Sequence, residues 1–211
     1  MALSRLYFVT GETDPLEQIE AACRAGVRLI QLRMKEVSDE EFLATAAAAV
    51  KICGGWGSRL IINDRVEVAA AVGADGVHVG KEDMPVQEAT RILGEGKIVG
   101  GTANTLDDIL EHYSGGADYI GLGPYRYTTT KKKLSPILGL EGYREIMRQM
   151  RVERVAVPVY AIGGIRMEDV GGLVEAGVYG VAFSGLMVSA TDGAAVVAEI
   201  LKQFSYVDYC G

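Results

Sequence analysis

Cationic and acidic side chains follow three short apolar runs of this sequence. Arg33 and Lys35 alternate with apolar residues, and so point to the same side of an extended segment. Asp64 follows the next apolar run along the chain, and Asp83 follows the one after that. Mg²⁺ is typically bound by one or two carboxylates together with substrate phosphates. The two cations and two carboxylates therefore suit the binding of a phosphorylated substrate with a magnesium ion.

Each of these residues also has a purely structural explanation. Arg33 and Lys35 would fit a solvated strand end, but burying cations without partners is costly, which favours a functional role. Asp64 and Asp83 would serve equally well as N-caps of the helices expected to follow them. The spacing alone does not separate metal binding from helix capping.

Glycine-bearing turns and one lysine form a second group of candidates. Gly163-Gly164 and Ser184-Gly185 each follow an apolar run, and backbone N–H groups of such turns bind phosphate. The alternative is a turn with no ligand. Lys131 follows three threonines in the long irregular stretch Gly123–Gly139 and is the best-placed lysine there to meet an anion. Lys132 and Lys133 read as a solvated charge run.

The elements that must position these residues alternate regularly. Apolar, β-rich runs are each followed by a longer amphipathic run, which predicts a parallel sheet with helices outside it. The predicted strands are Leu6–Val9, Leu29–Leu32, Leu60–Ile62, Gly76–Val79, Ile98–Gly101, Tyr119–Leu122, Val157–Ile162 and Gly180–Phe183. The predicted helices are Pro15–Ala25, Asp39–Cys53, Val66–Val72, Pro85–Leu93, Leu106–Tyr113, Leu140–Met150, Met167–Ala176 and Gly193–Gln203.

Eight strand–helix units predict an α/β fold, a single (β/α)₈ TIM barrel that forms one catalytic domain over residues 1–211. A doubly wound open sheet is the rival, but its glycine fingerprint would follow the first strand, and Gly11-Glu12-Thr13-Asp14 does not match it. In a TIM barrel the active site lies at the C-terminal ends of the strands, often with a phosphate site after strands seven and eight. The candidate residues all fall at that rim.

Composition excludes several classes of function. The net charge of −7 argues against a nucleic-acid partner, which would require a broad basic face. No run approaches the roughly 18 apolar residues that would span a membrane, and the first residues do not resemble a signal peptide. We therefore expect a cytoplasmic protein with no nucleic-acid or membrane partner; a homo-oligomer stays open. His78 is expected to be structural within the rim, and His112 to lie on a helix surface.

Six motifs, in order, resemble the thiamine-phosphate synthase family. The resemblance covers the chain from about Leu6 to Gly185. The motifs are Gln31-Leu32-Arg33-Met34-Lys35, Asn63-Asp64, Asp75 to Asp83, Gly121-Leu122-Gly123-Pro124, Thr128-Thr129-Thr130-Lys131-Lys132 and Ile162-Gly163-Gly164-Ile165. The resemblance implies a transferase that joins a hydroxymethylpyrimidine pyrophosphate to a thiazole phosphate, with Mg²⁺ as cofactor, and releases pyrophosphate.

The resemblance also implies a role for each matching residue. Pyrophosphate would leave first, and the thiazole nitrogen would attack the resulting pyrimidine-methyl cation. Arg33, Lys35 and Lys131 would stabilise the leaving group, and Asp64 and Asp83 would bind Mg²⁺. The pyrimidine pyrophosphate would contact Gln31, Arg33, Lys35, Asn63, Thr102 and Lys131, whereas the thiazole phosphate would contact Thr128, Thr130, Gly164, Phe183 and Ser184.

Three other functions are compatible with parts of this pattern. A related thiazole tautomerase would need an acid–base side chain, and Asn104 stands where many relatives of the family carry histidine. Met34 and Tyr127 also depart from the family pattern. A sugar-phosphate isomerase would need a pair of acid–base groups. A catalytically silent ligand-binding barrel would not need the charged rim to be intact.

Overall fold

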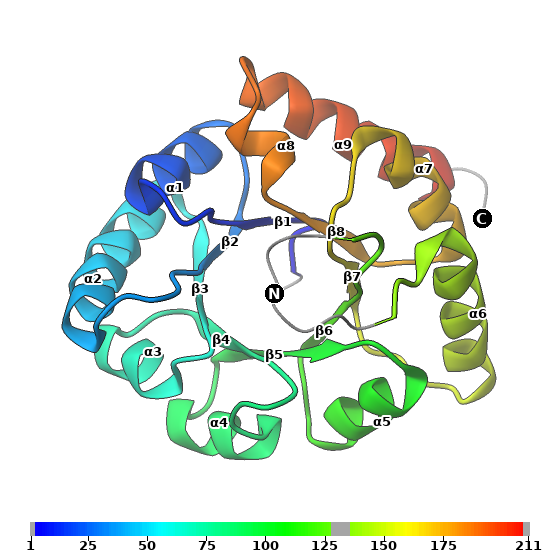
Figure 1. Ribbon diagram of the computed structural model, residues 1–211, viewed down its shortest axis with the longest axis horizontal. Coiled ribbons are helices and arrows are strands. Elements are labelled where there is room, and N and C mark those ends of the chain that lie inside the picture. The colour runs from blue at the N-terminus through cyan, green and yellow to red at the C-terminus, as the bar shows by residue number, and fades with distance from the viewer. Residues whose placement is uncertain (1–2, 128–135, 209–211) are drawn as a thin grey trace.

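The computed structural model describes residues 3–127 and 136–208, and it confirms the predicted barrel. The strands form a closed parallel barrel in sequence order, and the first strand pairs with the last (Figure 1). The strands are β1 (Leu6–Val9), β2 (Leu29–Leu32), β3 (Arg59–Asn63), β4 (Gly76–Val79), β5 (Ile98–Ala103), β6 (Tyr119–Leu122), β7 (Val159–Ala161) and β8 (Gly180–Phe183).

The helices form a ring outside the barrel (Figure 1). They are α1 (Pro15–Arg24), α2 (Asp39–Trp56), α3 (Val66–Val72), α4 (Val86–Leu93), α5 (Leu106–Ser114), α6 (Gly139–Val152), α7 (Met167–Ala176), α8 (Gly185–Val188) and α9 (Gly193–Asp208). Sequence analysis missed only α8 among these, because four residues are too few to show a helical period. Within the described ranges, no helix is both long and apolar enough to cross a bilayer.

Local capping explains where several helices begin. The Ser38 hydroxyl accepts a hydrogen bond from the Glu41 N–H at 3.1 Å, which begins α2. Thr105 and Asp108 form a reciprocal capping box at the start of α5. No such side-chain cap begins α1: Asp14 precedes this helix in a left-handed conformation, and its side chain makes no capping hydrogen bond.

Alternation along the strands divides the core into two layers. Inside the barrel, Tyr7, Tyr119 and Tyr160 pack edge to face with ring centroids 5.4–5.5 Å apart. The next residues along the strands, such as Phe8 and Ile120, point outward into the larger layer beneath the helices. The tyrosines fill the lower part of the barrel, which leaves its C-terminal end for the site.

Candidate active site

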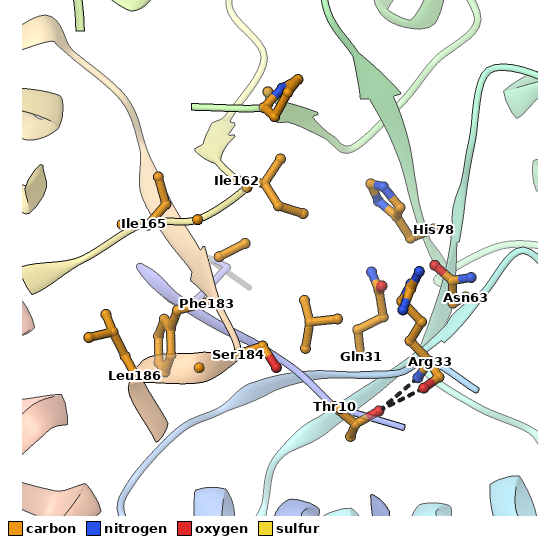
Figure 2. A pocket seen from close by; sticks show the side chains of 18 of the residues that line it. Thr10, Gln31, Arg33, Asn63, His78, Ile162, Ile165, Phe183, Ser184 and Leu186 are labelled. Carbon is orange, nitrogen blue, oxygen red and sulfur yellow. Dashed lines mark hydrogen bonds between the residues drawn. The ribbon is translucent and has the colours of Figure 1, made fainter. Parts of the chain in front are cut away.

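A cavity of about 970 Å³ opens at the C-terminal ends of the strands. Its lining includes at least one residue from the end of every strand or from the loop directly after it. Figure 2 shows two different walls: Gln31, Arg33, Asn63 and His78 lie on one side, and Ile162, Ile165, Phe183 and Leu186 lie on the other. One wall is therefore polar and cationic, and the other is mainly apolar.

Arg33 is the principal cation of the polar wall. Its backbone N–H donates to the Thr10 hydroxyl at 2.9 Å, and that hydroxyl donates to the Arg33 carbonyl at 3.2 Å (Figure 2). Burial lowers the pKa of the Arg33 guanidinium, whereas the negative charges of Glu12 and Asp64 raise it. The Arg33 Nη1 atom is 3.9 Å from the Glu12 carboxylate. An arginine in this setting remains charged at neutral pH and can bind an anion.

A hydrogen-bonded chain crosses the barrel beneath the cavity and joins β2 to β5. The Gln31 amide donates to the Tyr7 hydroxyl at 2.6 Å, and the Tyr7 and Tyr119 hydroxyls are 2.7 Å apart. The Tyr119 hydroxyl is 3.1 Å from His78 Nδ1, and His78 Nε2 is 2.9 Å from the Thr102 hydroxyl.

One set of donor directions gives the hydroxyl hydrogens of this chain an acceptor. Burial raises the pKa of both the Tyr7 and the Tyr119 hydroxyl, so both stay protonated and each supplies one hydrogen. With the Gln31 amide N–H donating to Tyr7, each hydroxyl hydrogen finds an acceptor within the chain when Tyr7 donates to Tyr119, Tyr119 donates to His78 Nδ1, and His78 Nε2 donates to Thr102. Gln31 presents its amide oxygen and Thr102 its hydroxyl hydrogen to a ligand. His78 lines the cavity at the rim, and its structural role stays a prediction.

Asp64 and Asp83 form a carboxylate pair at the edge of the polar wall. Burial, followed by the negative charge of Asp83, raises the pKa of Asp64 to about 6, while Asn63 and Lys35 act to lower it. The Asp64 backbone has a left-handed φ of 61°, and its N–H donates to the His78 carbonyl at 2.9 Å. Asp83 accepts from the Gly80 N–H at 2.8 Å.

The carboxylate pair fits a hard divalent cation. The residues that immediately precede α3 and α4 are Arg65 and Pro85, so neither aspartate caps these helices and that alternative is wrong. No group of three or more histidine, cysteine or acidic side chains with metal-binding geometry occurs among the described residues. Two carboxylates match Mg²⁺, which keeps its remaining positions for water and substrate phosphates.

The opposite wall combines glycine turns with apolar side chains. Gly163 and Gly164 follow β7 with left-handed φ values of 95° and 71°, so a side chain there would be strained. Phe183, at the end of β8, packs on Phe8 with ring centroids 6.2 Å apart. Ser184 precedes the short helix α8 and faces the cavity (Figure 2). This wall suits a flat apolar ring that carries a phosphate.

The structure brings together most, but not all, of the residues predicted from the sequence. Gln31, Arg33, Asn63, Thr102, Gly164, Phe183 and Ser184 all line the cavity. Lys35 is exposed beyond the end of β2, where its charge acts on Asp64. Thr128, Thr130 and Lys131 lie outside the described residues.

The expectation for His112 is wrong. Its ring is half-buried rather than on the helix surface, and Nε2 lies 2.9 Å from the Thr102 carbonyl oxygen. The ring packs over Gly101, where a Cβ atom would come within 2.8 Å of it. His112 therefore supports the backbone of a residue that lines the cavity.

Sequence reasoning missed several residues that line the cavity. They include Thr10, Glu12, Tyr127, Arg166 and Leu186. Arg166 follows directly after the glycine turn, and this adjacency to a candidate phosphate site was a usable signal. Glu12 carried no comparable signal, because its proximity to Arg33 depends on the pairing of β1 with β2.

Comparisons with known proteins show the family of this chain. Thiamine-phosphate synthase of Bacteroides thetaiotaomicron is 48% identical over 200 residues, covering 93% of this chain and 96% of the relative. Its counterpart in Flavobacterium psychrophilum is 41% identical and covers 93% and 97% of the two chains. The solved thiamine phosphate pyrophosphorylase of Pyrococcus furiosus superposes with a TM-score of 0.82 at 32% identity and covers 96% of both chains. Because the family model for thiamine monophosphate synthase also matches residues 6–186, this chain belongs to that family.

Proposed function

We propose that this enzyme transfers the methylpyrimidine group of a hydroxymethylpyrimidine pyrophosphate to the nitrogen of a thiazole phosphate. The products are thiamine phosphate and pyrophosphate. The observation that carries the proposal is the pair of unlike walls in one cavity: a cationic wall for the pyrophosphate faces a glycine-bearing, apolar wall for the thiazole. This arrangement would hold both reactants in a single orientation, which removes most of the entropic cost of their encounter.

The pyrimidine pyrophosphate would bind the polar wall. Gln31 and Thr102, joined through the hydrogen-bonded chain, would recognise the polar edge of the pyrimidine. Arg33 and Asn63 would contact the pyrophosphate. Lys35 and Lys131 complete the proposed set of cations. Both are assigned to the pyrophosphate because they match the family pattern.

Asp64 and Asp83 are the residues that would hold Mg²⁺. Burial and then repulsion from Asp83 raise the pKa of Asp64, and a dication bound by the pair would offset that repulsion. The bound ion would neutralise charge that develops on the departing pyrophosphate. Lys35 lies close enough to Asp64 to lower its pKa, so a cation of the protein also acts at this edge of the site.

The thiazole phosphate would bind the opposite wall. Gly164 and Ser184 would bind its phosphate, and Phe183 would pack against its ring. Thr128 and Thr130 are assigned to the same phosphate on the family pattern alone. Arg166 lines the cavity next to the glycine turn and adds a cation on this side.

The reaction needs charge stabilisation more than proton transfer. Pyrophosphate departs with the electron pair of the carbon–oxygen bond, and Arg33 stabilises the negative charge that it carries away. The thiazole nitrogen then donates its lone pair to the pyrimidine-methyl cation. No proton is removed from a carbon or oxygen atom in either step. The role of His78 inside the hydrogen-bonded chain, rather than as a general base, agrees with this mechanism.

We further propose that residues 1–211 form one catalytic domain that acts in the cytoplasm on small molecules. The closed barrel, in which β1 pairs with β8, supports the single domain. The family's role in thiamine biosynthesis supports the location.

A coupling assay tests the proposed function. Purified protein is mixed with the pyrimidine pyrophosphate, the thiazole phosphate and Mg²⁺, and the reaction is repeated with a chelator. We expect thiamine phosphate and pyrophosphate in equal amounts, and only when Mg²⁺ is present. Folded protein that forms no product from both substrates would contradict the proposal.

A further inference from the structure

The start of the β6–α6 loop runs alongside the glycine turn that follows β7. The Tyr125 N–H donates to the Ile162 carbonyl at 2.9 Å, and the Arg126 N–H donates to the Gly163 carbonyl at 3.1 Å. The two segments therefore stay hydrogen-bonded to each other past the ends of β6 and β7, along the wall of the cavity.

The Arg126 side chain adds further hydrogen bonds between this loop and the glycine turn. Its Nη1 atom donates to the Gly164 carbonyl at 2.9 Å and to Asp169 Oδ2 at 2.6 Å, and its Nη2 atom donates to Asp169 Oδ1 at 2.8 Å. Asp169 belongs to the first turn of α7 and its side chain is only 6% exposed. The same carboxylate accepts from the Arg166 N–H at 2.7 Å. Arg126 is thus held in one orientation by a buried partner.

These bonds determine which way the turn presents its N–H groups. In a trans peptide the carbonyl of one residue and the N–H of the next point in opposite directions. With the Gly163 and Gly164 carbonyls bound to Arg126, the N–H groups of Gly164 and Ile165 point away from Arg126. In residues 3–127 and 136–208, neither N–H has a protein acceptor, and both residues line the cavity.

We propose that Arg126 is a positioning residue that orients the Gly164 and Ile165 N–H groups toward the phosphate of the thiazole substrate. This inference rests on the proposed function, which assigns that phosphate to the glycine turn. Among the described residues, Arg126 is not part of the cavity lining, so it acts through the turn rather than on the substrate. Its charge is matched by Asp169, which leaves the recognition of phosphate to the backbone.

Two variants separate positioning from simple stabilisation. Arg126→Met removes the bonds to Gly164 and Asp169 but leaves a buried carboxylate without its partner, which lowers stability. Arg126→Met/Asp169→Asn removes that buried charge while the amide oxygen can still accept from the Arg166 N–H. Arg148→Met is the matched control, because Arg148 pairs with Glu145 on the exposed face of α6.

Steady-state kinetics should show a change in one Michaelis constant. In both Arg126 variants we expect the KM for thiazole phosphate to rise about tenfold, the equivalent of losing one hydrogen bond to a charged group. The KM for the pyrimidine pyrophosphate should stay within about twofold of the wild-type value. The double variant should regain thermal stability but not the lower KM, and Arg148→Met should change neither constant.

Nuclear magnetic resonance provides a test that does not depend on activity. Protein labelled with ¹⁵N at glycine and isoleucine is titrated with inorganic phosphate. The Gly164 and Ile165 amide signals should shift in the wild-type protein and not in the double variant. Equal shifts in both proteins, or no shift in the wild type, would overturn the proposal.

The two experiments also distinguish this inference from the proposed function. Wild-type enzyme that makes thiamine phosphate upholds the function, whatever the variants do. If the double variant then has a wild-type KM for thiazole phosphate, the positioning role is wrong. Wild-type protein that makes no product but shows the phosphate shifts would contradict the function and retain the role of Arg126 as an organiser of a phosphate site.

Discussion

At the scale of single residues, the burial of Asp64 next to Asp83 has a clear chemical consequence at the rim. A pKa of about 6 for Asp64 is above its ordinary value of 3.8, so the folded protein disfavours the ionised form. In metal-free protein, the contribution of Asp64 to folding stability therefore falls as the pH rises from about 4 to about 6. A divalent cation reverses this effect, because it binds the ionised form.

The first prediction concerns metal binding by this pair. Mg²⁺ alone should raise the Tm of the wild-type protein at pH ~7.5, and its affinity should be about fourfold weaker at pH ~5.5, where a proton competes for Asp64. Asp64→Asn should abolish both the metal response and its dependence on pH. The measurement is a thermal-shift titration with MgCl₂ at the two pH values.

The control for this titration is Asp107→Asn, which removes an exposed carboxylate on α5. It should leave the response to Mg²⁺ unchanged. A wild-type response that persists in Asp64→Asn would remove Asp64 from the metal site.

At the scale of elements, β5 shows how close packing positions the site. Gly100 faces the interior, where a Cβ atom would lie 2.1 Å from the Tyr119 ring. The absence of a side chain at Gly100 lets Tyr119 reach His78 and, through it, Thr102. On the other face, Gly101 admits His112, which binds the Thr102 carbonyl. Two glycines in one strand thus make room for the rings that hold a cavity residue in place.

The second prediction tests this packing. Gly100→Ala should lower the free energy of unfolding by about 1–3 kcal/mol, because the added methyl group forces the Tyr119 ring to move. Gly54→Ala is the comparison: Gly54 lies in α2, nothing surrounds a Cβ atom there, and alanine should stabilise the helix by roughly 0.5–1 kcal/mol. Urea unfolding measures both variants. If Gly100→Ala had the same free energy of unfolding as the wild-type protein, the barrel would accommodate the added methyl group without cost.

At the scale of the whole molecule, the barrel joins both ends of the chain. Strand β1 pairs with β8 from Leu6↔Val181 to Phe8↔Phe183, and α9 packs on α1 and α7. A site whose walls come from every strand therefore depends on closure of the barrel. We expect the site and the fold to be lost together on unfolding.

The third prediction follows from this dependence. Thermal unfolding should give one transition in which far-ultraviolet circular dichroism and the near-ultraviolet signal of the buried tyrosines coincide. Magnesium pyrophosphate at about 100 times its Kd should move both signals upward together by about 5–10 °C. Two separate transitions, or a shift confined to one signal, would contradict a single domain.

Much of the architecture was predictable from the sequence, because hydrophobic alternation is a local property. The periods of the apolar runs located every strand, and several boundaries agree with the structure, as in Leu29–Leu32 and Gly76–Val79. The order of the strands followed from the alternation of strand and helix. The rim residues Gln31, Arg33 and Asn63 were found because the end of a strand is itself a sequence signal.

Contacts between distant segments could not be predicted in the same way. The proximity of Asp64 to Asp83 depends on the register of β3 against β4, where Asn63 pairs with His78. Other features depend on how loops and helices pack on the closed barrel. These are the exposure of Lys35, the partial burial of His112 and the salt bridge between Arg126 and Asp169.

The sequence by itself thus determined the elements, their order, the family and the chemical types at the rim. Tertiary structure decided which of those side chains face one cavity and which bind each other. The physical reason is the distance along the chain over which each kind of interaction acts. Periodicity acts over one or two turns, whereas the hydrogen bonds of Arg126 to Gly164 and Asp169 join residues about 40 positions apart and form only when β6 and β7 are paired.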